Sequence, residues 1–164
     1  MGGKGTALAS YIQAIHQEIK MDIVGHIESA QREFELGEPV SVILSIRNHG
    51  KEQAFLLVPT GRAGGIQFEV KEGTKFVLLD MSREPEPGLQ AERRIAPSET
   101  LTIPVPLSNS LIIQEPGIYV VECTIPIDVS NKSLRDSGVG RSSKQVTIRS
   151  SVRFTVVPKH RTNK

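Results

Sequence analysis

The sequence has one cysteine, no tryptophan, five Phe and two Tyr among its 164 residues. With Cys123 alone, an intrachain disulfide is excluded. Because aromatic residues are few, the hydrophobic core must consist mainly of Val, Ile and Leu, which suit pleated, half-buried surfaces. The scarcity of aromatics also argues against carbohydrate binding, because the apolar face of a sugar ring needs an exposed aromatic platform.

Long hydrophobic runs are also missing. No stretch approaches the roughly 20 apolar residues of a membrane-spanning helix, so no membrane span is expected. The first twenty residues include Lys4, His16, Glu18 and Lys20 and lack the continuous apolar segment of a signal peptide. The compartment stays open: an extracytoplasmic location fits if a leader has been removed, and a cytoplasmic one fits if Met1 is the native start.

Residue patterns that carry chemistry are scarce. The four histidines, His16, His26, His49 and His160, form no metal-binding spacing with one another or with Cys123. Cys123 lies in an alternating apolar run, which predicts a buried structural thiol rather than a nucleophile. These patterns predict no catalytic residues, no metal and no cofactor, and hence a protein that is not an enzyme.

Charge is unevenly distributed along the chain. Residues 1–129 hold 11 Lys/Arg against 17 Asp/Glu, whereas residues 130–164 hold 9 Lys/Arg against the single acid Asp136. A basic C-terminal fifth favours contact with an acidic partner or an anionic ligand. Nucleic acid is a less favoured partner because aromatic stacking residues are nearly absent from this region.

The N-terminal segment, residues 1–21, has the periodicity of one amphipathic helix. Its apolar residues Leu8, Ile12, Ile15 and Ile19 are spaced by four, three and four positions, which places them on one stripe. At roughly 13 residues such a helix would be marginal alone. The stripe is therefore expected to pack on the main domain or on another chain, including a second copy of this one.

From residue 22 onward the pattern predicts strands and no further helix. The clearest is 40–48, with apolar side chains at every second position and central placement in its sheet. The run 99–107 carries Pro104 and Pro106 on one face, which predicts an edge strand or a strand end. The loop "KEGT" between 65–70 and 75–80 predicts a hairpin. The expected strands are 22–29, 33–36, 40–48, 54–58, 65–70, 75–80, 99–107, 117–125 and 146–157.

Three stretches carry a resemblance to known proteins: "FELGEPVSVILSIRN", "IAPSETLTI" and "PGIYVVEC". They resemble bacterial immunoglobulin-like modules, including the intracellular proteinase inhibitor family and macroglobulin-type and fibronectin-like modules. The resemblance covers about residues 33–127. It implies a sandwich in which the hydroxyl of Tyr119 bonds back to nearby backbone as a tyrosine corner. It carries over no functional residue.

These patterns predict an all-β protein, an antiparallel immunoglobulin-like β-sandwich of seven to nine strands with one N-terminal amphipathic helix. The expected organisation is a helical segment at 1–21, the sandwich at 22–158 and a basic tail at 159–164.

The predicted function is that of a protein–protein interaction module, an accessory domain that acts through an edge strand and a long basic loop at 128–145. The expected contact residues are Arg62, Arg135, Arg141 and Lys144, with the helix stripe as a second surface. Two alternatives remain: a proteinase inhibitor acting through an exposed loop, and a weak binder of anionic ligands or nucleic acid through the basic C-terminal region.

Overall fold

A computed structural model describes residues 22–58, 66–78, 91–133, 135–136 and 143–159. This part of the chain is all-β, with no α-helix and a single short 3-10 turn, η1, at Leu107–Asn109. The predicted N-terminal helix lies outside the described residues, as does the tail beyond Lys159. In chain order the strands are β1 Ile23–Ser29, β2 Glu33–Glu35, β3 Ser41–Asn48, β4 Ala54–Val58, β5 Gln67–Glu72, β6 Phe76–Leu78, β7 Ala91–Ile95, β8 Thr100–Pro106, β9 Leu111–Ile113, β10 Gly117–Ser130 and β11 Ser143–Val157.

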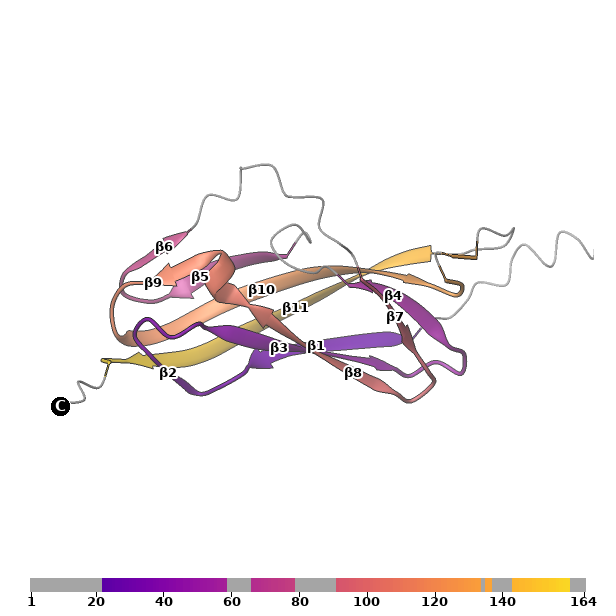
Figure 1. Ribbon diagram of the computed structural model, residues 1–164, viewed down its shortest axis with the longest axis horizontal. Coiled ribbons are helices and arrows are strands. Elements are labelled where there is room, and N and C mark those ends of the chain that lie inside the picture. Colours follow the sequence, from indigo (N-terminus) through magenta and orange to yellow (C-terminus); the bar gives the residue numbers. More distant parts are fainter. Residues whose placement is uncertain (1–21, 59–65, 79–90, 134, 137–142, 160–164) are drawn as a thin grey trace, which may run out of the picture.

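The strands form three sheets. The smaller main sheet has the order β1-β3-β8, and the larger has the order β2-β11-β10-β4-β7, with β5 also paired to β10. The third sheet consists of β6 and β9 alone. The two main sheets form two layers with the core between them (Figure 1).

The hairpin of β10 and β11 is the longest feature of the fold. The two strands pair without interruption from Gly117–Val156 to Ser130–Ser143. On its other side β10 pairs with β5 as far as Thr124 and with β4 from Asp128. Pro126, which has no backbone N–H, lies in the gap between these two partners. A proline is thus tolerated within a central strand because no ladder bond is required of it there.

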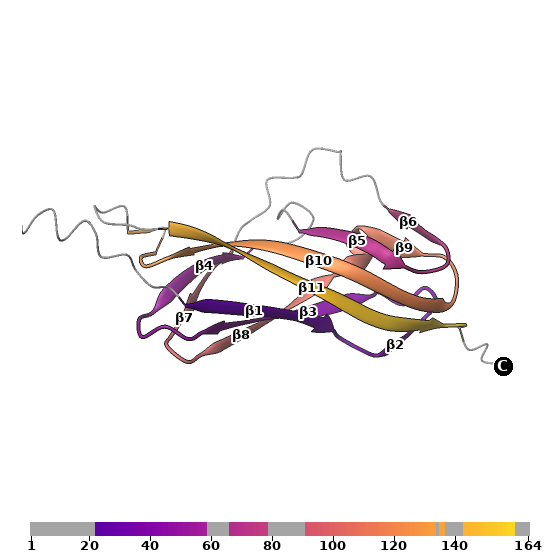
Figure 2. The ribbon, with the colours of Figure 1, turned by 180° about the vertical axis from the view of Figure 1, so that it is seen from behind.

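The segment from β1 to β2 joins the two layers. β1 pairs with β3 in the smaller sheet, and β2 then pairs in parallel with β11 in the larger one. The two layers also meet directly, because the hydroxyl of Ser150 on β11 donates to the carbonyl oxygen of Ile27 on β1 at 2.9 Å. The segment therefore runs alongside β11 and closes one side of the molecule (Figure 2).

The core follows the alternation seen in the sequence. Val42, Leu44 and Ile46 are fully buried on β3, and β3 is the central strand of its sheet, as predicted. Between the layers Phe154 contacts Phe34 edge-on, with ring centroids 5.5 Å apart, and stacks on Tyr119 at 5.9 Å. These contacts gather most of the few aromatic side chains of the core at one place, where they contribute beyond simple burial.

The same turn occurs at two places. Each turn, 35–38 and 96–99, ends in a glutamate whose backbone N–H donates to the carbonyl of the first residue of the turn. The carboxylate of the same glutamate accepts the backbone N–H of that first residue. The third residue is left-handed in both turns: Gly37 has φ +89° and Ser98 has φ +63°. This is the type II geometry, in which a positive φ is required at the third position. It accounts for both the "LGEP" and the "PSET" signals.

Several strand predictions are confirmed, and others are wrong. Pro104 and Pro106 do lie on an edge strand, β8. The predicted hairpin around "KEGT" is wrong, because β5 pairs with β10 and β6 pairs with β9. The intervening Gly73 lies against the ring of Tyr119, where an added Cβ would come within 2.5 Å of Cδ1. The Tyr119 hydroxyl oxygen also lies 2.9 Å from Thr74 Oγ1 and 3.2 Å from the carbonyl oxygen of Lys75. These contacts turn the chain away from β5.

Two strands were missed. β7 lies at the end of the stretch 83–94, "REPEPGLQAERR", whose prolines and charges predict an extended segment on the surface. Its sequence "AERRI" buries only Ile95 deeply, so it carries no alternating apolar signal. β9 is three residues long and pairs only with β6. Both strands depend on backbone pairing with distant segments, which a local pattern does not encode.

Gly25 provides a test of how tightly the layers meet. A Cβ built on Gly25 would lie 1.9 Å from Cδ1 of Ile148, so Gly25→Ala is expected to lower the free energy of unfolding by about 1–3 kcal/mol through overpacking. Ile148→Val removes Cδ1, the nearest atom. The double variant should therefore lose less stability than the sum of the losses in the two single variants. Urea denaturation of the four proteins measures this coupling. Strict additivity would contradict the contact.

Candidate functional site

The structure describes two of the eight predicted contact residues. Arg62, Arg141 and the helix stripe of Leu8, Ile12, Ile15 and Ile19 lie outside the described residues. Arg135 and Lys144 are both exposed. Lys144 was predicted to lie in a loop. It lies instead on β11, where it pairs with Val129.

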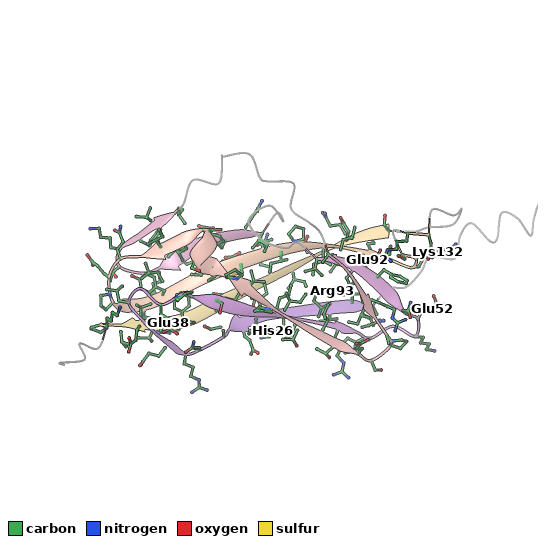
Figure 3. All side chains as sticks on the ribbon, viewed as in Figure 1. His26, Glu38, Glu52, Glu92, Arg93 and Lys132 are labelled. Carbon is green, nitrogen blue, oxygen red and sulfur yellow. The ribbon has the colours of Figure 1, made fainter. Side chains whose placement is uncertain are left out.

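The predicted loop at 128–145 is therefore too long at both ends. β10 continues to Ser130 and β11 begins at Ser143, so the connection spans 131–142. Its described part is held by serine hydroxyls: Ser130 Oγ donates to the Lys132 carbonyl at 2.6 Å, and Ser133 Oγ donates to Glu92 Oε1 at 2.5 Å. Figure 3 shows Glu92 and Lys132 at this end of the molecule and Glu38 at the opposite end. The hairpin end is thus tied to β7.

The outer side of β8 is blocked as a site for strand addition. Leu107 N–H donates to the Val40 carbonyl, and the Glu99 carbonyl accepts from Asn48 N–H, so the odd-numbered residues direct their backbone groups toward β3. The even-numbered residues then face outward, because alternate residues of a strand point to opposite sides. Two of these are Pro104 and Pro106, which lack an N–H. Prolines at such positions are a common protection of sheet edges.

β11 has the opposite character on its side away from β10. Thr155 N–H donates to the Arg32 carbonyl at 3.0 Å, and the Val157 carbonyl accepts from Leu36 N–H at 2.8 Å. Odd-numbered residues of β11 therefore direct their backbone groups away from β10. Among the described residues only β2 pairs on this side, at Thr155–Val157. The backbone groups of Ser143, Gln145, Thr147, Arg149 and Ser151 have no strand partner in the described part of the chain.

β1 does not cover the beginning of this side. β1 and β11 meet at Gly25 and Ile148 and again at Ile27 and Ser150. Toward their N-terminal ends the two strands move apart (Figure 2). We call the backbone side formed by Ser143, Gln145 and Thr147, with the adjoining Arg149, the open edge of β11. It contains no proline.

The outer face of the larger sheet carries a row of charges beside this edge. The Glu122 carboxylate on β10 lies 3.7 Å from Lys71 Nζ on β5 and 3.7 Å from Arg149 Nε on β11. Lys71 also pairs with Glu69, and this hydrogen bond raises the pKa of Lys71. Arg149 and Arg153 are exposed on the same face, opposite the buried Phe154.

The buried polar groups are fully used in holding the fold. Asn48 is 1 % exposed, and its side chain donates to the carbonyls of Glu52 and Ile95 and accepts from Gly50 N–H. The Tyr119 hydroxyl donates to the Glu115 carbonyl at 2.7 Å, which confirms the predicted bond back to nearby backbone. No buried nitrogen or oxygen atom of a described side chain lacks a hydrogen-bond partner.

A pocket of about 180 Å³ lies between the β2–β3 turn and β9. Its wall is mostly apolar and includes Val40, Leu111 and Val156, while Glu35 and Glu38 contribute carboxylates. The Glu38 carboxylate is already bonded to Glu35 N–H and to the Gln31 side chain. Among the described residues the wall includes the hydroxyl-bearing Ser108 but no histidine, cysteine, lysine or arginine.

Two absences concern the described residues alone. In this part of the chain no group of three or more His, Cys, Asp or Glu side chains could hold a metal ion. Within the same residues no helix has the length and apolar character to cross a membrane. Residues 59–65, 79–90, 134 and 137–142 lie outside the described ranges.

Comparison with known proteins adds no assignment. A scan against protein-family models found no match, and a search of curated proteins found none either.

Cys123 yields a prediction on pH dependence. It is buried, as the sequence predicted, and burial raises the pKa of its thiol from the ordinary 9.0 to about 11. Between these values the unfolded chain loses the thiol proton and the folded chain keeps it, so stability falls as the pH rises. The expected loss is about 2–3 kcal/mol between roughly pH 9 and pH 11. Urea unfolding should show a smaller loss in Cys123→Ala, and equal losses in both proteins would contradict the burial.

Proposed function

We propose that this chain is a non-enzymatic interaction module of the immunoglobulin-like β-sandwich type. The strand order supports the fold: β1-β3-β8 corresponds to strands A, B and E, and β11-β10-β4-β7 to strands G, F, C and C′ of such domains. Two further features support it. β2 pairs in parallel with β11, and the Tyr119 hydroxyl bonds back to the Glu115 carbonyl at the start of β10, as a tyrosine corner does.

The working surface that we propose is the open edge of β11 together with the basic hairpin end. One observation carries the proposal: within the described residues the edge has no strand partner and no proline, whereas β8 is blocked by two prolines. Sheet edges recognise extended partner segments by adding them as a further strand, with main-chain hydrogen bonds supplying affinity. Arg135 and Lys144, both predicted contact residues, lie at the same end as this edge.

Other surfaces fit this role less well. β2 has only three residues, which is too short for a stable added strand. β7 presents Glu92, Arg93 and Arg94 along its five residues, and closely spaced charges protect an edge against pairing. The buried thiol of Cys123 and the fully bonded polar core support a binding role over a catalytic one.

A pair of proline substitutions tests the proposal. Thr147→Pro removes an N–H from the open edge without touching the ladder with β10, and Thr102→Pro removes the equivalent outward N–H on the blocked edge of β8. With a partner that co-purifies from the source of the protein, Thr147→Pro should weaken binding by about tenfold or more, because strand pairing loses a main-chain bond and meets a clash. Thr102→Pro should bind as the unchanged protein does.

Binding is measured by calorimetry on proteins whose melting temperatures have been compared. Gln145→Pro serves as a second variant on the same edge in case Thr147→Pro does not fold. The proposed function would be overturned if a folded Thr147→Pro or Gln145→Pro variant bound the partner with the same affinity as Thr102→Pro.

A further inference from the structure

The charges around the open edge indicate which segment it would take. From residue 130 on, the described residues include a single acid, Asp136. The six basic side chains in the same described residues are Lys132, Arg135, Lys144, Arg149, Arg153 and Lys159. Asp136 lies in the connection and not on β11. β11 itself carries three basic residues and no acidic one.

Basic side chains flank the open edge on both faces of the sheet. Arg149 and Arg153 share the outer face with the other odd-numbered residues of β11, whereas Lys144 lies on the opposite face, in line with Val146 and Ile148. Lys144 is nevertheless exposed, because it lies at the far end of the hairpin. A strand added to this edge would alternate its side chains between the two faces. Acidic side chains on either face would then meet a cation.

The neighbouring acids offset this charge only in part. The Asp128 carboxylate accepts from Gln145 Nε2 at 3.4 Å. Glu122 is shared between Lys71 and Arg149. Glu28, the one acid of β1, is exposed and lies on the outer face of the smaller sheet, away from the edge that faces β11.

We propose that the open edge of β11 binds an extended, acidic peptide segment of a partner protein, which adds as a strand beside Ser143–Arg149. This inference rests on the proposed function and goes beyond it by naming the partner's chemistry. Backbone pairing supplies the affinity, and Lys144 and Arg149 supply the preference for acidic side chains. Opposite charges on neighbouring strands stabilise the pairing, and like charges disfavour it.

Three labelled ten-residue peptides with blocked ends test this inference on the full chain by fluorescence anisotropy. One alternates valine and glutamate, one alternates valine and lysine, and one is the valine–glutamate peptide with two valines replaced by proline. The first should bind at least about tenfold more tightly than either of the others. On binding, the backbone amides of Gln145 and Thr147 should become protected from hydrogen exchange, while the amide of Thr102 should not change.

Charge reversals locate the preference on the surface. Lys144→Glu and Arg149→Glu should each weaken binding of the valine–glutamate peptide by about fivefold or more, because an attraction becomes a repulsion. Arg94→Glu makes the same change in net charge on β7 and serves as the matched control, with no effect expected.

Each remaining outcome has a definite meaning. Equal binding of the valine–glutamate and proline-containing peptides would reduce the site to a general attraction for anions and would overturn the inference. Absence of binding, or a preference for the lysine peptide, would overturn it as well. In either case the proposed function is tested separately, by whether Thr147→Pro lowers the affinity for the co-purified partner. If Thr147→Pro abolishes partner binding while Lys144→Glu and Arg149→Glu leave it unchanged, the partner uses the open edge but does not add an acidic strand there.

Discussion

The continuous ladder between β10 and β11 positions most of the molecule. β5, β4 and β2 all pair with one of these two strands, and β7 reaches the larger sheet through β4. The smaller sheet is in turn held against β11 by the contact of Gly25 with Ile148 and by the bond from Ser150 to the Ile27 carbonyl. Because the aromatic contacts of Tyr119 and Phe154 lie across the same ladder, packing and hydrogen bonding depend on one register.

The sequence predicted those parts of the fold that depend on local alternation. β3 and β8 were predicted because each buries one face, and the prolines of β8 identified it as an edge strand. Tyr119 was placed by the short "PGIY" signal. The hairpin around "KEGT" could not be judged locally, because the partner of Gly73 is a tyrosine 46 positions further on. β7 and β9 were missed because their stability comes from pairing and not from a buried stripe.

The candidate site was predictable in kind but not in place. Composition indicated a basic C-terminal region, and the prolines of 99–107 indicated an edge strand at β8. That one side of β11 has no neighbour is recorded by no sequence pattern. Lys144 was assigned to a loop because strands that extend past the core lose their apolar alternation, as "SKQ" does at the start of β11. The side of β11 that is open depends on the backbone direction at Thr155 and Val157.

The parallel pairing of β2 with β11 also determines how the molecule would respond to mechanical force. Traction on the chain at residue 22 and at residue 159 would draw these two strands in opposite directions along their length. The bonds of Thr155 to Arg32 and of Leu36 to Val157 would then be loaded in shear and would have to rupture together, not one after another. A domain connected in this way would resist stretching between its ends until this short ladder gave way.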